Sequence, residues 1–444
     1  MSKSNSLLKY FDSKYPDSPK YRQSFSKYLP YLESVLNSSD LYKKNLILER
    51  LIIPERSIKF RINWVDDKGK VRVNRGYRVQ MNSNLGPYKG GLRFNKDVDE
   101  DTFMFLAFKQ IFKNCLTGLP LGAGKGGADL DPKNLSDNEM MQFCQSFMLE
   151  MHRYIGQLTD VPAGDMGVGS REIGYMYAYY RKINNVFTGT MTGKSVENGG
   201  SKLRTEATGY GLIYFVNAML EKMGEDWKDK KCLLSGAGNV SLHAAEKILE
   251  FKGKVLSLSD SGGVIYSKKG FTKKDLEKIK KQKLVEKLSL EKIAASGDFE
   301  YKKGKKPWDF EADIALPCAT ENELDESDAK KLIENGIRIV AEGANMPCSS
   351  EAIDLFQKKK VLFVPDIAAN TGGVYVSGLE ITQNATFQNW GTKKVDKLLK
   401  ETMENIHEKC ISEGQEKNYV NYEKGAIKYA FKRIAESMLN DGVV

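Results

Sequence analysis

The alternation of apolar and polar positions changes its rhythm along the chain. Residues 1–50 have amphipathic helical spacing, whereas residues 58–64 and 71–81 alternate apolar with polar side chains. A period of two is typical of β-strands, so these two runs predict a strand pair. Helical patterns follow over residues 99–116 and 136–156. The first part of the chain is therefore expected to form a mixed α/β domain.

From about residue 200 onward, short apolar runs alternate with helical segments. Residues 232–235 and 254–259 are apolar, and residues 240–251 between them have helical spacing. Three more apolar runs follow, at residues 312–316, 337–341 and 361–364. Strands that alternate with helices predict a parallel, doubly wound sheet of the Rossmann type.

The length of 444 residues exceeds what one ordinary core holds, so we expect two domains. The first covers residues 1–200, and an amphipathic helix at about residues 425–444 is expected to rejoin it. The second covers residues 201–424. Together they predict an α/β protein with a mixed first domain and a Rossmann-like second domain.

The composition of the chain limits where the protein is expected to work and what it is expected to bind. With 41% hydrophobic and 28% charged residues, the chain resembles a soluble globular protein, and it has no apolar run that could span a bilayer. Its six cysteines form no CxxC pair, which favours reduced thiols in the cytoplasm. The three histidines have no metal-ligand spacing, so no metal site is expected.

The net charge of +10 raises the possibility of nucleic-acid binding. Much of the excess lies in residues 267–306, where the lysines follow a helical pattern without arginines among them. Solvated lysine faces on surface helices explain this better. We therefore expect no nucleic-acid partner.

Three lysines lie close to glycines within a short span. Lys89 is in GPYKGGLRF, Lys113 follows an aromatic-rich helical run, and Lys125 is in GAGKGG. Glycine lets the backbone approach a ligand closely. We expect turns at the two glycine-rich segments, and we expect the three lysines to direct their ammonium groups toward one small molecule with several negative charges, such as a dicarboxylate.

Two glycine motifs compete for the role of dinucleotide-binding turn. Gly122, Gly124 and Gly127 match G-x-G-x-x-G exactly, but the following ADLDPKN does not open a helix. A pyrophosphate needs free N–H groups at the start of a helix that follows a strand. This context rejects the exact match.

The second motif matches the G-x-G-x-x-G pattern less closely, but the predicted strand before it and the predicted helix after it fit a dinucleotide-binding turn better. Gly236, Gly238, Asn239 and Val240 follow the apolar run KCLLS and open a helical pattern, although Ser241 replaces the third glycine. These residues are predicted to bind the dinucleotide. An ordinary strand-to-helix turn is the alternative interpretation.

Several segments resemble glutamate dehydrogenase, in particular its small hexameric branch. They occur in order between about residues 80 and 390: GPYKGGLRF, FKQIFKN, LGAGKGGADLDP, DVPAGDMGVGSREIGYM, EATGYG, GAGNV, PCATENELD, EGANMP and AANTGGVYVSGLE. Small departures are Ala123 and Thr205. The resemblance implies reversible oxidative deamination of L-glutamate to 2-oxoglutarate and ammonium. It also implies a homohexamer assembled through a substrate-binding first domain.

Site residues follow from the same resemblance. Lys89 and Ser377 would hold the side-chain carboxylate of the substrate, while Gln110 and Lys113 would hold its α-carboxylate beside the backbone of Gly164. Charge-assisted hydrogen bonds of this kind contribute about 1.5 to 3 kcal/mol each.

The resemblance also implies that Lys125 and Asp165 perform the chemistry. Oxidation of the α-carbon leaves an iminium group, and water must then attack to release ammonia. A lysine among other cations should have a lowered pKa, which suits Lys125 as the base for that water. Asp165 would carry protons to and from the nitrogen.

Cofactor contacts are expected at Thr208, Asn345 and Asn370, which the resemblance assigns to the nicotinamide and its ribose. Asp260 ends the second strand and would ordinarily favour NAD. However, Asp260 and Ser261 look like the corresponding stretch of NADP-preferring relatives. We expect NADP, and NAD remains possible.

Two other functions stay open. A related leucine, valine or phenylalanine dehydrogenase should lack a cation at the position of Lys89, because a buried unpaired ammonium group is costly. An inactive ligand-binding or nucleic-acid-binding relative would not be expected to keep Lys89, Lys113, Lys125 and Asp165 together.

Overall fold

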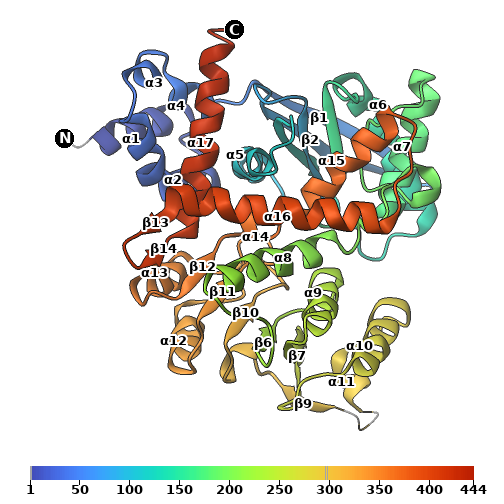
Figure 1. Ribbon diagram of the computed structural model, residues 1–444. Coiled ribbons are helices and arrows are strands. Elements are labelled where there is room, and N and C mark those ends of the chain that lie inside the picture. Colours follow the sequence, from blue (N-terminus) through green and yellow to red (C-terminus); the bar gives the residue numbers. More distant parts are fainter. Residues whose placement is uncertain (1–2, 296, 298) are drawn as a thin grey trace. The chain divides into compact units, whose positions relative to one another are not determined.

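The computed structural model describes residues 3–295, 297 and 299–444 (Figure 1). It divides into two compact units. Unit 1 comprises Met1–Arg204, Val374–Val395 and Ile427–Val444, and unit 2 comprises Thr205–Gly373 and Asp396–Ala426. Each unit is an α/β structure around its own sheet, which confirms the predicted fold class. Positions 296 and 298 of the lysine-rich stretch lie outside the described residues.

Unit 1 is built on a five-stranded mixed sheet with the order β1-β2-β4-β3-β5. Strands β1 and β2 form the predicted antiparallel pair, β4 runs antiparallel to β2, and β3 lies parallel between β4 and β5. The strands are β1 Arg56–Val65, β2 Val71–Asn82, β3 Tyr88–Phe94, β4 Ala123–Ala128 and β5 Asp160–Gly164.

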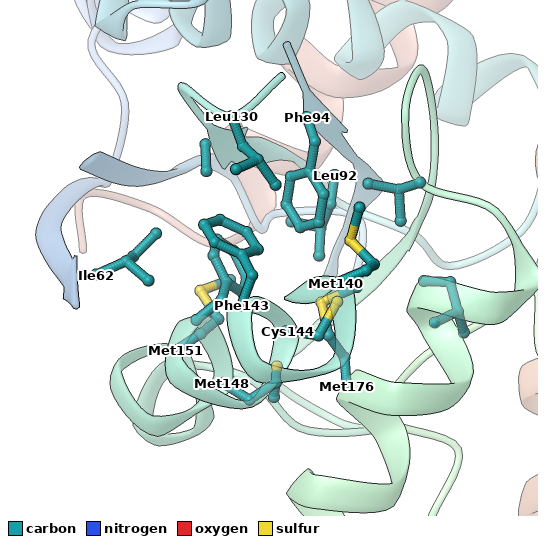
Figure 2. Packing of buried hydrophobic residues seen from close by; sticks show 14 of the residues in the cluster. Ile62, Leu92, Phe94, Leu130, Met140, Phe143, Cys144, Met148, Met151 and Met176 are labelled. Atoms are coloured by element: carbon teal, nitrogen blue, oxygen red, sulfur yellow. The ribbon is translucent and has the colours of Figure 1, made fainter. Parts of the chain in front are cut away.

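Helices cover both faces of this sheet. On one face α6 and α7 close a core that contains Phe94, Phe143 and Met176, which Figure 2 shows as members of one cluster. On the other face α5 packs on β2 and β4, and α2 packs on α5. The helices are α1 Lys3–Lys14, α2 Pro19–Leu36, α3 Asp40–Lys44, α4 Ile47–Leu51, α5 Glu100–Leu116, α6 Asp137–Met151 and α7 Ser170–Asn184, with 3-10 turns at His152–Tyr154 and Val196–Asn198.

Two later segments also belong to unit 1. The C-terminal helix α17, Tyr422–Asn440, contributes residues from Ile427 onward, close to the predicted boundary. Residues Val374–Val395 likewise belong to unit 1, although the sequence placed them in the second domain. The reason is helix α15, Gly372–Ala385, whose polar side chains bond to the segment that precedes Arg204.

Unit 2 is built on a seven-stranded sheet with the order β12-β11-β10-β6-β7-β8-β9. The first five strands in this order are parallel, whereas β8 and β9 are antiparallel additions at one edge. The strands are β6 Lys231–Leu234, β7 Lys254–Asp260, β8 Gly263–Tyr266, β9 Glu300–Lys303, β10 Ile314–Leu316, β11 Ile339–Ala341 and β12 Leu362–Val364. A short pair, β13 Gln415–Glu416 and β14 Tyr419–Val420, lies outside this sheet.

Its helices alternate with the parallel strands, as the sequence predicted. They are α8 Ala207–Lys222, α9 Asn239–Glu250, α10 Lys273–Lys280, α11 Leu290–Ala294, α12 Glu326–Glu334, α13 Ser350–Lys358, α14 Asp366–Ala369 and α16 Thr392–Gly414, with a π-helical turn at Lys281–Val285 and a 3-10 turn at Pro307–Asp309. Helices α12 and α13 pack together over a core that includes Leu233, Val340 and Phe356. None of the helices in the described part of the chain is long and apolar enough to cross a membrane.

The glycine-rich segment around Lys125 is a strand, so the expectation of a turn was wrong there. Lys89 likewise lies on strand β3. The glycines are needed because the neighbouring backbones come very close: a Cβ at Gly90 would lie 1.9 Å from the carbonyl oxygen of Gly124. Only residues without a Cβ allow the strands to approach in this way.

Candidate active site

Lys125 reaches across strand β3 to the end of β5. The parallel register pairs Leu92 of β3 with Gly126 of β4 on one side and with Gly164 of β5 on the other. Gly91 leaves the space for the crossing, because a Cβ there would lie 2.7 Å from the Cβ of Asp165 and 3.3 Å from the Nζ of Lys125. The sheet order therefore brings together two residues that are forty positions apart in the chain.

Lys125, Asp165 and Arg93 form a buried cluster. The Nζ of Lys125 donates to Oδ2 of Asp165 at 2.7 Å, and the Nε of Arg93 lies 3.4 Å from the same oxygen. Burial lowers the pKa of Lys125, which Asp165 opposes and Arg93 reinforces. For Asp165 burial acts in the opposite direction, but Lys125 and Arg93 together hold its pKa well below the usual range. The cluster thus places a lysine whose charged form is disfavoured by burial beside a carboxylate whose charged form is favoured by two cations.

Lys89 lies four residues before Arg93 on the same strand and is 2% exposed. Burial is the main reason that its pKa is well below the ordinary lysine value, and the positive charges of Arg204 and Arg78 lower it further. The carboxylates of Glu380 and Asp160 act in the opposite direction. Asp160 is already held by the buried Arg78. A buried ammonium group among guanidinium groups favours an anion as its ligand.

Ser377 and Arg204 belong to the same neighbourhood. The Nε of Arg204 donates to the Oγ of Ser377 at 2.9 Å, and Ser377 is buried on α15. The structure thus links the predicted Ser377 to the surroundings of Lys89 through Arg204. Sequence reasoning missed Arg204, because nothing in the pattern distinguished it from other basic residues beside EATGYG.

Gln110 and Lys113 lie on α5. Asn114, one turn after Gln110, connects this helix to the strands. Gln110 donates to the Oδ1 of Asn114 at 2.6 Å, and Asn114 donates to the carbonyl oxygens of Lys89 at 3.0 Å and Gly122 at 2.6 Å. Gln110 is buried beside β3, whereas Lys113 is half-buried. Asn114 was also missed, although its spacing of four from Gln110 places both on one helix face.

Unit 2 contains the predicted strand, turn and helix. Strand β6 ends at Leu234, and α9 begins at Asn239 with Gly238 as its N-cap. Gly236 has a φ of +78°, which favours glycine, and a Cβ at Gly238 would meet no atom within 4 Å. Gly238 and Asn239 are exposed, and Val240 is half-buried. The first N–H groups of α9 therefore face open space, where a diphosphate could accept from them.

The loop after β7 has its carboxylate already engaged. Asp260 accepts from the Nζ of Lys283 at 2.9 Å and from the backbone N–H groups of Leu290 at 2.8 Å and Gly262 at 3.0 Å. These contacts hold its pKa below the usual value although burial opposes them. Ser261 beside it is exposed. Asp260 thus presents a neutralised carboxylate rather than a free negative charge.

A nicotinamide group fits the polar atoms near the end of α14. Asn370 donates through Nδ2 to the carbonyl oxygens of Gly343 and Ala344 and to Oδ1 of Asn345, whereas its own buried Oδ1 has no hydrogen-bond partner among the described residues. Such an acceptor matches the NH₂ of a carboxamide. Thr208 lies half-buried in the first turn of α8, within the same unit.

Metal ligation has no support in the part of the chain that the structure covers, since no group of three or more His, Cys, Asp and Glu side chains there could hold an ion. The chemistry available is that of a base, a carboxylate and a dinucleotide turn. These features are typical of one class, the nicotinamide-dependent dehydrogenases.

Comparisons with known proteins identify the family. The model of the Glutamate/Leucine/Phenylalanine/Valine dehydrogenase family matches residues 199–442, and that of the Glu/Leu/Phe/Val dehydrogenase dimerisation domain matches residues 54–182. The chain therefore belongs to this family of NAD(P)-dependent oxidoreductases.

Similar proteins match along almost the whole chain. An NAD-specific glutamate dehydrogenase of Bacteroides fragilis is 45% identical over 450 residues, with 99% of each chain covered. An NADP-specific glutamate dehydrogenase of Escherichia coli is 45% identical over 439 residues, covering 99% of this chain and 98% of the relative. The crystal structure of Plasmodium falciparum glutamate dehydrogenase superposes with a TM-score of 0.97 at 45% identity, covering 99% of this chain and 95% of that one.

Proposed function

We propose that this protein catalyses the reversible oxidative deamination of L-glutamate to 2-oxoglutarate and ammonium. The observation that carries the proposal is the buried ammonium group of Lys89 among Arg78 and Arg204, on the strand that also separates Lys125 from Asp165. A substrate with a carboxylate at the end of its side chain compensates the positive charges around Lys89. Lys125 and Asp165 supply acid–base chemistry at the other end of the substrate.

Binding of the distal carboxylate is assigned to Lys89, Ser377 and Arg204. A guanidinium and an ammonium group that share one carboxylate give charge-assisted bonds of about 1.5 to 3 kcal/mol each. Gln110 and Lys113 are proposed to hold the α-carboxylate, together with the backbone N–H of Gly164. Asn114 keeps α5 in place for this purpose through its bonds to β3 and Gly122.

Lys125 and Asp165 are proposed to perform the proton transfers. When bound, the nicotinamide supplies the acceptor for the two electrons that leave the α-carbon, and the donor for the reverse reaction. Neutral Lys125 then removes a proton from the water that attacks the imine carbon, a role that burial supports because it lowers the pKa of this lysine. Asp165, ionised beside it, accepts and returns the proton on the substrate nitrogen.

We propose NADP as the preferred cofactor. The carboxylate of Asp260 is neutralised by Lys283, so it repels a 2'-phosphate less than a free aspartate would. Relatives of the same similarity carry both NAD-specific and NADP-specific names, which makes the choice one for measurement. We expect kcat/KM to be higher with NADPH than with NADH. Lys283→Ala should reduce that ratio about tenfold, an electrostatic change of about 1.4 kcal/mol.

The decisive experiment is the loss of NADPH absorbance on mixing with 2-oxoglutarate and ammonium. Lys125→Ala should lower kcat by a factor of about 10² to 10⁴, the usual contribution of a general base. The exposed Lys133 of the same unit is the matched control, and Lys133→Ala should keep the wild-type rate. A Lys125→Ala rate within a few-fold of wild type would remove Lys125 from the mechanism.

The same assay separates the alternatives. A leucine, valine or phenylalanine dehydrogenase would use the corresponding branched or aromatic 2-oxo acids faster than 2-oxoglutarate. An inactive binding protein would oxidise neither NADPH nor NADH with any of them.

We further propose that the protein is a cytoplasmic homohexamer. Light scattering measures its mass in solution and so tests the hexamer. All six cysteines are buried free thiols, which fits a reducing compartment.

A further inference from the structure

Glu380 is a carboxylate that lies close to the proposed ligands of the substrate's distal carboxylate. It follows Ser377 by one turn of α15. Its negative charge acts on both Lys89 and Arg204, where it counteracts the lowering of their pKa values by burial. Nothing in the proposed reaction uses this side chain. A free carboxylate at such a place would bind the same cations as the substrate.

The structure shows what holds Glu380 instead. Its Oε1 accepts from the Nζ of Lys194 at 2.8 Å, and both side chains are fully buried. Its Oε2 accepts from the backbone N–H of Gly193 at 3.1 Å. The Nζ of Lys194 also donates to the carbonyl oxygen of Met191 and lies 5.1 Å from the ring centre of Tyr177. The ammonium group of Lys194 is therefore held by an ion pair, a hydrogen bond to a carbonyl oxygen and a cation–π contact.

A pair of this kind is expensive to bury and is weak evidence for stability, because desolvation can exceed the Coulombic gain. A role in specificity is the better explanation when the pair lies next to a charged site. Without Lys194, Glu380 would be left with Lys89 and Arg204, the two cations on which its charge already acts, and Arg204 bonds to Ser377 one turn before it on α15. Both cations would then be occupied by an internal carboxylate.

We propose that Lys194 is a positioning residue that withholds Glu380 from Lys89 and Arg204, and so leaves both cations available for the distal carboxylate of the substrate. This inference rests on the proposed function and extends it to the origin of dicarboxylate specificity. Lys194 itself is assigned no contact with substrate or cofactor. It acts by binding a carboxylate that would otherwise compete with the ligand, whereas Asp160 is already held by Arg78.

The test is a double-mutant cycle on KM. Lys194→Met frees Glu380 and should raise KM for 2-oxoglutarate at least tenfold, with kcat within threefold of wild type. Glu380→Gln removes the competitor and should leave KM no higher than in wild type. The double variant should return KM to within threefold of wild type, because no free carboxylate remains. A purely structural pair would instead give a double variant as poor as the worse single one.

Two controls sharpen the result. The five-carbon 2-oxopentanoate lacks the distal carboxylate, so its kcat/KM should stay within twofold in Lys194→Met. Lys247→Met in unit 2 removes another buried lysine, one that pairs with Glu250 at 2.8 Å, and should leave KM for 2-oxoglutarate unchanged. An unchanged KM in Lys194→Met, or a tenfold rise in Glu380→Gln, would overturn the proposal.

The outcome is separable from that of the proposed function. Wild-type turnover of 2-oxoglutarate tests the function alone. If turnover is absent, calorimetric Kd values for 2-oxoglutarate should still follow the same order among wild type, the single variants and the double variant. If Lys194→Met does not fold, the Glu380→Gln value and its predicted lack of a rise decide the question.

Discussion

The two glycine motifs of this chain have nearly the same letters and very different structures. In unit 1 Gly122–Gly127 contributes strand β4, and in unit 2 Gly236–Ser241 forms a turn and the first residues of helix α9. The environment of the glycines differs as well. A Cβ at Gly127 would lie 1.8 Å from the carbonyl oxygen of Arg93, whereas a Cβ at Gly238 would meet nothing within 4 Å.

The difference teaches that a glycine can be required for two opposite reasons. In β4 the protein itself occupies the space, so that neighbouring strands and the side chain of Lys125 can lie close together. In the turn before α9 the space is empty, and the exposed backbone is available to a ligand. Spacing alone does not distinguish these cases, whereas the apolar run before and the helix after do.

The largest expected effect is a loss of activity when the contact between Lys125 and Asp165 is changed. The close approach of the strands in unit 1 makes this contact possible. Asp165→Asn should lower kcat about a thousandfold, within the range of acid–base catalysis. Burial lowers the pKa of Lys125 and Asp165 raises it, so loss of the charge should move the acidic limb of the deamination profile to lower pH. A limb that stays in place while kcat falls would show that another group titrates there.

The next effect tests the crowding directly through stability. Gly127→Ala should lower the free energy of unfolding by about 3 kcal/mol, because the new Cβ meets backbone and the φ of +148° is strained for alanine. Thermal unfolding and urea titration measure it. Gly238→Ala serves as the matched control, since its φ of −100° suits alanine and its surroundings are open. Equal losses in both variants would contradict the distinction drawn here.

How far the sequence predicted these structures depends on the kind of interaction. Periodicity identified the strand pair, the alternating second unit and helix α17, because burial of one face imposes a repeat on the sequence. The conformation around Lys125 was mispredicted as a turn, because glycine has no side chain to show periodicity. Strand β4 is specified by its neighbours rather than by its own residues.

The candidate site residues also differ in whether the local sequence pointed to them. Lys89 and Lys125 were singled out as candidates from their glycine-rich surroundings, whereas Arg204 and Asn114 were not. Their partners are far away in sequence: Arg204 bonds Ser377, and Asn114 bonds the backbone of Lys89. Such pairings arise from the order of the strands and from the return of α15 to unit 1. A single sequence contains no local signal for these distant pairings, although the spacing of four from Gln110 was a local signal for the helix face of Asn114.

A smaller effect is expected on the cofactor side. Gly238→Ala should raise KM for NADPH about tenfold, equivalent to about 1.4 kcal/mol, because a methyl group would occupy the space through which a diphosphate approaches the N–H groups of α9. The free energy of unfolding should change by less than about 0.5 kcal/mol. The assay varies NADPH at saturating 2-oxoglutarate. An unchanged KM would mean that the cofactor does not approach this backbone.

The smallest effect belongs to Ser241, the residue that replaces the third glycine of the fingerprint. Ser241 is fully buried, and its Oγ donates to the carbonyl oxygen of Gly238 at 3.2 Å. Since this small side chain already fits, Ser241→Gly should change KM for NADPH by less than twofold. The loss of the hydroxyl and the added freedom of the unfolded chain should cost up to about 1 kcal/mol of stability. A KM several-fold lower than wild type would show instead that serine holds the helix away from the dinucleotide, and that the exact fingerprint binds better.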